Sequence, residues 1–366
     1  MVIKFDNYDL GYLVVSVAKD KNTADAYLEK GLACLFIDNN QINVLPFNKK
    51  LVCRNQEDRL ALLRNHDAIE IGEDGMGYLY YSDASQDNGI VITGQCNSNC
   101  VMCPSSDLSR KKAGLHSLND LIMLASHIPP SVGHLTITGG EPFLIRNDIF
   151  TFFSYLKQRY PFTEFLLLTN GRAFSIEKYC MSLADTIPRK TVIGIPIHGY
   201  DEATHDSVTR SPGSFRQTAA GIKQLAKYGV FVEIRMVVSK ITACYITEIA
   251  KLVLSEFNNV SSVKIMGLEM LGNAAINQND IWIPYREAFE ASKEAVNLLI
   301  SSGIDVSLYN FPLCAVDAEY WQICAQSITD NKVRFAPKCS QCHYQDACGG
   351  LFSGSYRLAS PDVQPL

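Results

Sequence analysis

Three cysteines lie within eight residues of one another, in the segment Cys96-Asn97-Ser98-Asn99-Cys100-Val101-Met102-Cys103. Structural zinc takes four ligands, usually in two separated pairs, so three closely spaced thiols are an unusual zinc pattern. Three thiolates can instead hold three irons of a [4Fe–4S] cluster and leave the fourth iron open for a small chelating ligand. The spacing favours such a cluster, with a three-cysteine zinc knuckle or unrelated thiols as the alternatives.

A second group of cysteines lies near the end of the chain. Cys314 is followed by Cys339, Cys342 and Cys348, the last three in the spacing Cys-x2-Cys-x5-Cys. Four thiolates can saturate one iron–sulfur cluster or one tetrahedral zinc ion, and the sequence leaves both open. Cys324 is either an alternate ligand or, as we expect, a buried thiol on a helix over 320–327.

The expected pattern of secondary structure, which must position these cysteines, changes at Gly89. From there the chain alternates strands and helices, with strands expected at 89–93, 134–138, 165–169, 191–198, 230–238 and 263–266. Helix starts are marked by two expected capping boxes, Ser117 with Asp120 and Ser214 with Gln217. Six β/α units in series predict a parallel sheet that curls into a partial barrel, with reactive groups at the C-terminal strand ends.

The chain therefore divides into three expected parts. Residues 1–88 form a small, mostly β module with one helix near 57–64, residues 89–275 form the partial barrel, and residues 276–366 carry the second cysteine group. The predicted fold class is α/β, a partial (β/α)6 parallel barrel with a β-rich N-terminal module and a C-terminal iron–sulfur extension.

Polar and small residues mark the C-terminal ends of three expected strands. The second strand ends in Gly139-Gly140-Glu141-Pro142, where two glycines would let a ligand approach the backbone closely. The third strand ends in Thr169 and Asn170, and the fourth ends in His198. His198 is either a ligand-contacting residue or a strand-end histidine with its hydrogen bonds satisfied.

The fifth expected strand has two different faces. Val232, Ile234 and Met236 form an apolar face that should contact the helices, whereas Glu233 and Arg235 share the other face. A charged pair turned into a barrel needs a ligand or a partner. The pair is therefore either part of a ligand site or a self-contained ion pair.

The cysteine loop, followed a few dozen residues later by Gly-Gly-Glu-Pro, resembles the radical S-adenosylmethionine (SAM) enzymes. The resemblance covers about 89–350. It implies that the open iron binds the amino and carboxylate groups of SAM. It also implies that an electron passed through the cluster cleaves SAM to methionine and a 5′-deoxyadenosyl radical, which abstracts a hydrogen atom.

The same resemblance implies roles for individual residues. Gly139, Gly140, Glu141 and Pro142 would contact the methionine amino group of SAM. Arg235, oriented by Glu233, would contact the carboxylate or the ribose of SAM. Met102 stands where the family often has an aromatic residue near adenine, and 267–272 resembles a glycine-containing stretch also near adenine. The remaining expected cofactor contacts are Thr169, Asn170 and His198.

The second cysteine group resembles the auxiliary-cluster extension of radical SAM enzymes that modify peptides and proteins. A full-length extension has a further cysteine where this chain has Phe352, so a shortened, one-cluster form is expected. The tail is most similar to maturases of the His-Xaa-Ser peptide system. This implies a peptide substrate, an electron donor such as flavodoxin or ferredoxin, and a second radical SAM maturase as partners.

Composition limits the classes of function and the cellular location that the chain could have. The 366 residues carry a net charge of −5, which argues against general nucleic-acid or membrane-surface binding. No signal peptide or membrane-spanning run is apparent, and twelve cysteines without a disulfide framework suit a cytoplasmic metalloprotein. The competing functions are a radical SAM enzyme acting on a small molecule or an RNA base, and a zinc-stabilised peptide-binding scaffold.

Overall fold

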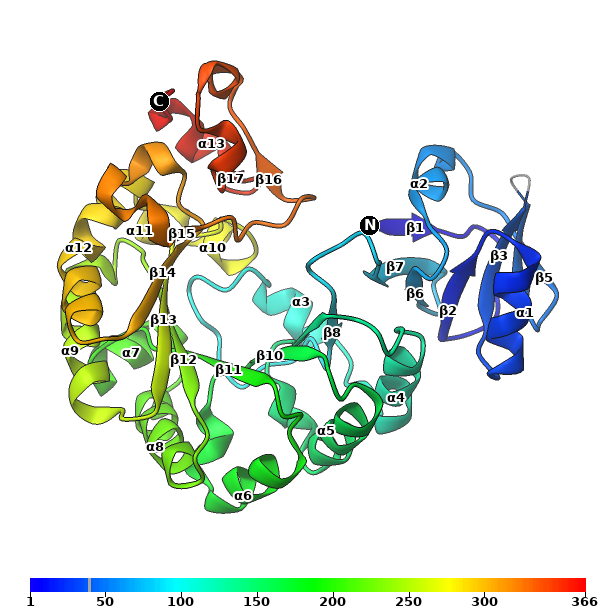
Figure 1. Cartoon of the computed structure of the whole chain (residues 1–366), viewed down its shortest axis with the longest axis horizontal. Coiled ribbons are helices and arrows are strands. Elements are labelled where there is room, and N and C mark those ends of the chain that lie inside the picture. Colours follow the sequence, from blue (N-terminus) through cyan, green and yellow to red (C-terminus); the bar gives the residue numbers. More distant parts are fainter. Residues whose placement is uncertain (39–40) are drawn as a thin grey trace.

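The structure is a computed structural model that describes residues 1–38 and 41–366. Its largest element is an eight-stranded, fully parallel sheet that curls around a central space (Figure 1). In spatial order its strands are β8 (Gly89–Val91), β9 (His134–Thr138), β10 (Glu164–Leu168), β11 (Thr191–Pro196), β12 (Val232–Val237), β13 (Val260–Met266), β14 (Asp305–Tyr309) and β15 (Cys324–Ala325). The predicted curled parallel sheet is confirmed, with all six expected strands in sequence order.

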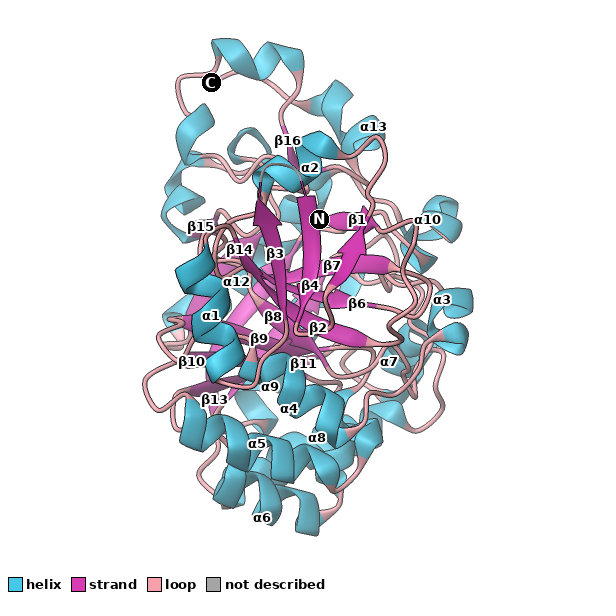
Figure 2. Cartoon of the chain, turned by 90° about the vertical axis from the view of Figure 1, so that its right-hand side faces the viewer, coloured by secondary structure: helices cyan, strands magenta, loops and turns pink. Residues whose placement is uncertain are grey.

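Helices cover the convex face of this sheet (Figures 1 and 2). They are α4 (Leu118–Ser126), α5 (Asp148–Arg159), α6 (Glu177–Thr186), α8 (Ser214–Lys227), α9 (Ile246–Glu256) and α12 (Tyr285–Ser301). The outward side chains of the strands, such as Ile193, Ile195 and Ile234, are fully buried against these helices. Burial of this continuous apolar layer is the main source of stability for the barrel.

The two expected capping boxes have different outcomes. At α4 the hydroxyl of Ser117 accepts the Asp120 N–H, and the Asp120 carboxylate accepts the Ser117 N–H, as predicted. At α8 the prediction was wrong, because the N-cap is Gly213 in a left-handed conformation with φ of 80°. There the carboxylate of Asp206 accepts the N–H groups that a capping side chain would otherwise satisfy.

In its described residues, 1–38 and 41–88, the N-terminal module contains a seven-stranded sheet and two helices. Its strands, in spatial order, are β1 (Val2–Lys4), β7 (Met76–Tyr81), β6 (Ala68–Ile71), β2 (Leu13–Ala18), β3 (Cys34–Asp38), β4 (Gln41–Leu45) and β5 (Lys49–Leu51). The expected helix is present as α2 (Glu57–Leu62). Helix α1 (Lys21–Glu29) was not expected, although Asp20 caps it by accepting the Thr23 N–H.

One face of this sheet packs on the barrel and the other covers a separate small core. On β2, Val15 and Val17 belong to the module's own core, whereas Val14 joins the barrel core beside α4. Between them, the Ser16 hydroxyl lies 2.8 Å from Nδ1 of His127, which follows α4. The alternation of side chains along one strand therefore joins the module to the barrel.

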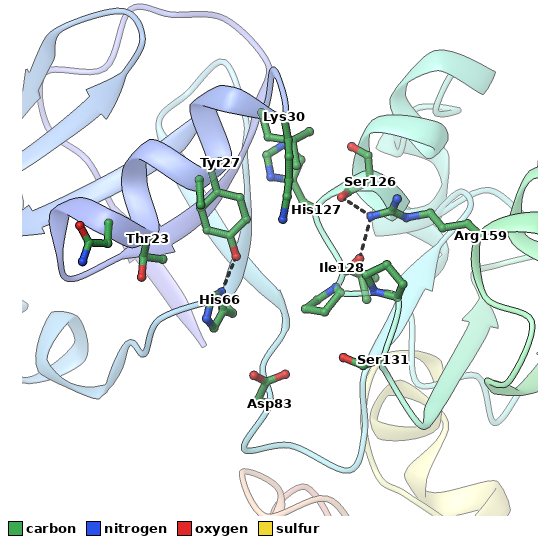
Figure 3. Close-up of a pocket in the computed structure, with 15 residues that line it drawn as sticks. Thr23, Tyr27, Lys30, His66, Asp83, Ser126, His127, Ile128, Ser131 and Arg159 are labelled. Carbon is green, nitrogen blue, oxygen red and sulfur yellow. Dashed lines mark hydrogen bonds between the residues drawn. The ribbon is translucent and has the colours of Figure 1, made fainter.

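A cavity of about 490 Å³ lies where the module meets the barrel (Figure 3). Tyr27 and His66 line it from the module, and His127 and Arg159 line it from the barrel. The guanidinium of Arg159 donates to the Ser126 and Ile128 carbonyl groups at the end of α4. These barrel residues precede β9 and β10, so the cavity lies at the N-terminal ends of the strands, away from the cysteine loop that follows β8.

The C-terminal part continues the barrel sheet before it departs from it. The sheet includes β14 and β15, which lie beyond residue 275, the boundary expected for the barrel. The expected helix over 320–327 is a short 3-10 helix, Ala318–Ile323, followed by β15, because Cys324 and Ala325 pair with the edge of β14. A small ribbon of β16 (Val333–Arg334) and β17 (Leu351–Phe352) and helix α13 (Tyr356–Ala359) complete this part.

Four short helices lie on the loop side of the barrel. They are α3 (Asp107–Lys112), α7 (Glu202–Thr209), α10 (Asn273–Ile276) and α11 (Gln278–Ile281). Among all described residues, no helix is long and apolar enough to cross a membrane.

The buried His127 should make the docking of the module sensitive to acid. Burial, and then the charge of Arg159, lower the pKa of His127 from 6.5 to about 4. Because the unfolded chain binds this proton more readily, the stability contributed by neutral His127 is complete above about pH 6.5 and is lost as the pH falls towards about 4, by up to about 1.4 kcal/mol per pH unit.

We expect His127→Gln, which can still bond to Ser16, to lose less thermal stability than the parent protein between about pH 7 and about pH 5. The exposed His134→Gln is the matched control. Equal losses in melting temperature for all three proteins would show that His127 does not carry this dependence.

Candidate functional site

The three cysteines after β8 are gathered in one half-buried loop. Burial, followed by the charges of Cys96 and Cys103, raises the pKa of the Cys100 thiol to about 12. The Cys96 and Cys103 thiols therefore lie close enough to Cys100 to disfavour its ionisation, and positive charge placed among the three would favour the thiolate form. This donor set fits an iron–sulfur cluster ligated by Cys96, Cys100 and Cys103.

The number of thiols in the loop favours a cluster, because three thiolates leave one iron of a [4Fe–4S] cluster open, whereas structural zinc takes four ligands. Within the described ranges, no three or more His, Cys, Asp or Glu side chains are placed to hold one metal ion. A mononuclear zinc site needs all its sulfur atoms about 2.3 Å from one point. A cluster spreads its ligands over several irons, so its thiolates stand farther apart.

Residues from distant segments hold the loop in place, and the sequence did not reveal them. The guanidinium of Arg172 donates to the carbonyl of Asn97 at 2.7 Å and to the hydroxyl of Ser98 at 3.0 Å. From the other side, the Asn273 amide donates to the Cys100 carbonyl at 3.0 Å, and the Asn277 amide to the Val101 carbonyl at 2.9 Å. Two backbone bonds to the end of α7 complete this support.

The Gly139-Gly140 pair is required by the chain's own backbone. A Cβ atom on Gly140 would overlap the Gln95 carbonyl, and one on Gly139 would overlap the Thr93 carbonyl. The Gly140 N–H donates to the Thr93 carbonyl at 2.8 Å. Close packing against the segment that leads into the cysteine loop is thus a second reason for these glycines, beside the expected room for a ligand. Within the described chain no donor reaches the Gly139 and Gly140 carbonyl oxygens, which leaves them as ligand acceptors.

The Glu141 carboxylate points into the protein and joins two strand ends. It accepts hydrogen bonds from the Thr169 hydroxyl at 2.8 Å, the Asn170 N–H at 2.8 Å and the Phe143 N–H at 3.1 Å. Burial raises the pKa of this carboxyl, and these hydrogen bonds oppose that shift. The Asn170 amide in turn donates to the Asn97 side chain at 2.7 Å. The structure therefore brings Glu141, Thr169 and Asn170 together beside the cysteine loop.

Glu233 and Arg235 form the expected pair on β12. The Arg235 Nε lies 3.2 Å from the Glu233 Oε1, yet neither atom makes a hydrogen bond with any described residue. The guanidinium stands over the Tyr309 ring at 5.9 Å. Gly194 on β11 makes room for it, because a Cβ there would lie 3.2 Å from the Arg235 Cδ. The opposite face, Val232, Ile234 and Met236, is fully buried as predicted.

The terminal nitrogens of Arg235 make no hydrogen bond within the described chain and can serve a ligand. His198, just after β11, is buried, and burial followed by the charge of His205 lowers the pKa of its imidazole to about 3. Its N–H backbone group donates to His205, while its own Nδ1 has no partner among the described residues. His198 is therefore a neutral imidazole with an unused polar atom.

Met102 packs in a small apolar cluster with Leu268 and Met270, which follow β13. The two segments expected near adenine therefore lie side by side. The thioether of Met102 fills an apolar place that an aromatic ring could also fill.

The four C-terminal cysteines also come together. Cys314, Cys339, Cys342 and Cys348 line one pocket. Backbone N–H groups of Leu313 and Gly350 each donate to the Cys348 sulfur at 3.4 Å. Cys324 does not line this pocket, and its thiol donates to the Tyr320 carbonyl at 3.6 Å, as a protonated, unligated cysteine does.

The Glu141 network generates a prediction about the loop. In Glu141→Gln, an amide N–H₂ should replace one of the two carboxylate oxygens that now accept hydrogen bonds. At least one of the Thr169, Asn170 and Phe143 donors should then be left unsatisfied in a buried position. We expect a loss of about 1–3 kcal/mol in the free energy of unfolding and faster hydrogen exchange at the Asn170 N–H. The exposed Glu164→Gln on β10 is the control. Equal losses of stability and equal exchange rates in both variants would show that the Glu141 hydrogen bonds do not hold the two strand ends together.

Comparison with known proteins agrees with this geometry. Residues 90–253 match the model of the Radical SAM superfamily. The chain is 28% identical over 187 residues to the antilisterial bacteriocin subtilosin biosynthesis protein AlbA of Bacillus subtilis, a match covering 49% of this chain and 40% of AlbA. It is 26% identical over 151 residues to the AdoMet-dependent heme synthase of Nitratidesulfovibrio vulgaris, covering 41% and 39% of the two chains. The matched region is thus less than half of each relative.

The fold is similar to that of SuiB from Streptococcus suis, solved with its precursor peptide SuiA. The TM-score is 0.50 at 11% identity, over 63% of this chain and 49% of SuiB. Residues 90–253 therefore match the Radical SAM superfamily model, and the similar fold and the gathered Cys96, Cys100 and Cys103 loop agree with that match.

Proposed function

We propose that this protein reductively cleaves SAM to a 5′-deoxyadenosyl radical and uses it to modify a ribosomally synthesised peptide. The observation that carries this proposal is the pair of cysteine sets, three in a loop at the end of β8 and four around one pocket in the C-terminal part. Three thiolates leave one iron open, whereas four leave none. The similarity to AlbA, a bacteriocin biosynthesis protein, supports a peptide as the substrate.

The chain's own residues would bind and orient SAM. The cluster held by Cys96, Cys100 and Cys103 would supply the electron that breaks a carbon–sulfur bond of SAM. The free carbonyls of Gly139 and Gly140 suit the methionine amino group, and the terminal nitrogens of Arg235 suit its carboxylate. The segments that carry Met102 and Leu268, both expected near adenine, pack against each other, and His198 offers a neutral polar contact.

The second cysteine set suits an auxiliary [4Fe–4S] cluster. Backbone N–H groups directed at the Cys348 sulfur, and one from Leu366 to the Cys342 sulfur at 3.4 Å, stabilise thiolate charge. Because four thiolates occupy every iron, this cluster would accept an electron from the substrate radical without binding substrate itself. Zinc remains the alternative occupant that metal analysis must test.

Several finer assignments belong to the same proposal. They are the three-part division at residues 88 and 275, with a barrel sheet that continues past the second boundary, the relation to the His-Xaa-Ser maturases, and a second radical SAM maturase as partner. The match to the heme synthase also keeps a small-molecule substrate as the competing function.

The decisive experiment is anaerobic reconstitution followed by mass spectrometry of SAM products with and without candidate precursor peptides. We expect about eight irons per chain, two clusters of four. The triple variant in which Cys96, Cys100 and Cys103 become Ala should lose about half of the iron and all SAM cleavage.

Replacing Cys314, Cys339, Cys342 and Cys348 by Ala should instead leave SAM cleavage to 5′-deoxyadenosine and abolish peptide modification. Replacing Cys324 is the matched control and should change neither. Zinc without iron after anaerobic preparation, or normal peptide product from protein lacking the second cluster, would refute the corresponding assignment.

Arg235 allows a separate test of SAM binding. A charge-assisted hydrogen bond contributes about 1.5–3 kcal/mol, so Arg235→Ala should weaken SAM binding by about ten- to a hundredfold while leaving the iron content unchanged. Exposed Arg216→Ala is the control. Normal SAM affinity, or protein that precipitates, would favour a purely structural ion pair with Glu233.

A further inference from the structure

The outer side of the cysteine loop borders a groove on the protein surface. Residues 95–99 line one wall, and Asp107, Arg110 and Lys111 of α3 line the other with Arg210. Cys96 is half-buried and belongs to this lining, so the first cysteine of the loop borders the groove. The groove is therefore a surface site that adjoins the cysteine loop.

The charge of this groove is opposite to that of the whole chain. Lys111 is 72% exposed, Arg210 is exposed, and Lys112 continues the basic edge of α3. Asp107 alone among the described lining residues is acidic, and it is paired with Lys111 at 2.6 Å. The groove thus has an excess of positive charge on a protein whose net charge is −5.

Exposed apolar side chains flank the same groove. Leu108 on α3 is 62% exposed, and Ile276 on α10 is 73% exposed. The two helices lie side by side (Figures 1 and 2), joined by a hydrogen bond from the Asp107 N–H to the Asn273 side chain at 2.9 Å. Apolar side chains beside charges of one sign form a surface suited to a transient protein partner of opposite charge.

The groove and this flank are also in direct contact with the loop. Arg110 is buried and its guanidinium bonds to Asn99, while Asn273 and Asn277 of the α10 segment bond to the Cys100 and Val101 carbonyls. A protein docked on α3 and α10 would therefore contact the segments whose residues bond directly to the cysteine loop.

We propose that this surface docks an acidic one-electron carrier protein, which reduces the cluster held by Cys96, Cys100 and Cys103. The proposal rests on the proposed function, because it concerns the reduction that SAM cleavage requires. In each encounter one electron leaves the carrier and enters the cluster, the carrier is oxidised by one electron, and no bond or proton is exchanged.

The test uses a purified acidic flavodoxin and the double variant Lys111→Glu/Arg210→Glu. Binding is measured by titration of flavodoxin into cluster-free protein, and cluster reduction by stopped-flow absorbance with reduced flavodoxin. We expect at least about tenfold weaker binding and slower reduction at low salt, and a flatter salt dependence than in the parent protein.

Two controls keep the test specific. Arg210 donates a hydrogen bond to Asn277, so its replacement could also disturb the support of the cysteine loop. The variant Lys111→Glu/Lys112→Glu leaves that contact intact and should likewise weaken flavodoxin binding and slow cluster reduction. Lys178→Glu/Lys227→Glu, on exposed positions of α6 and α8, should behave as the parent.

Dithionite-driven SAM cleavage should be unchanged in every variant, because a small reductant needs no docking surface. Failure of dithionite to support cleavage in the parent protein would count against the proposed function and would leave the binding measurement intact. Parent-like binding and reduction rates in both groove variants would overturn the docking surface.

Discussion

Close contact between two backbone segments underlies the whole candidate site. The segment after β8 and the loop after β9 approach so nearly that no side chain fits at Gly139 or Gly140, and the Gly140 N–H bonds across the gap to the Thr93 carbonyl. The cysteine loop begins immediately beyond this contact. Its position relative to the other strand ends is therefore fixed by backbone packing, and the Glu141 carboxylate extends the same connection to β10.

The parts of this structure that follow from local pattern could be predicted from sequence. The alternation on β12 separated Arg235 from the apolar face, and the order of strands and helices gave the curled parallel sheet. The start of α8 could not be read in this way, because Asp206, eight residues before Ser214, supplies its cap. The same limit applies to Cys324, whose strand conformation depends on pairing with β14.

The residues that support the cysteine loop show most clearly what could not be predicted from the sequence. Arg172, Asn273 and Asn277 contact the loop from segments more than seventy residues away in sequence. No periodicity marks them, because each acts through one side chain whose partner is a backbone carbonyl. Arginine and asparagine at loop positions are common, so only the folded chain distinguishes these three from ordinary surface residues.

The continuation of the barrel sheet through β14 has a consequence for the second cysteine set. Val306 and Leu308 of β14 face the helices, and Ser307 and Tyr309 alternate with them on the other face. A slip of one residue in strand register would exchange these faces and expose Val306 and Leu308. The cost of that exchange holds the register, and with it the start of the segment that leads from Tyr309 to Cys314. The apolar pattern of β14 thus fixes where the segment that leads to Cys314 begins, to within the rise of one residue, about 3.3 Å.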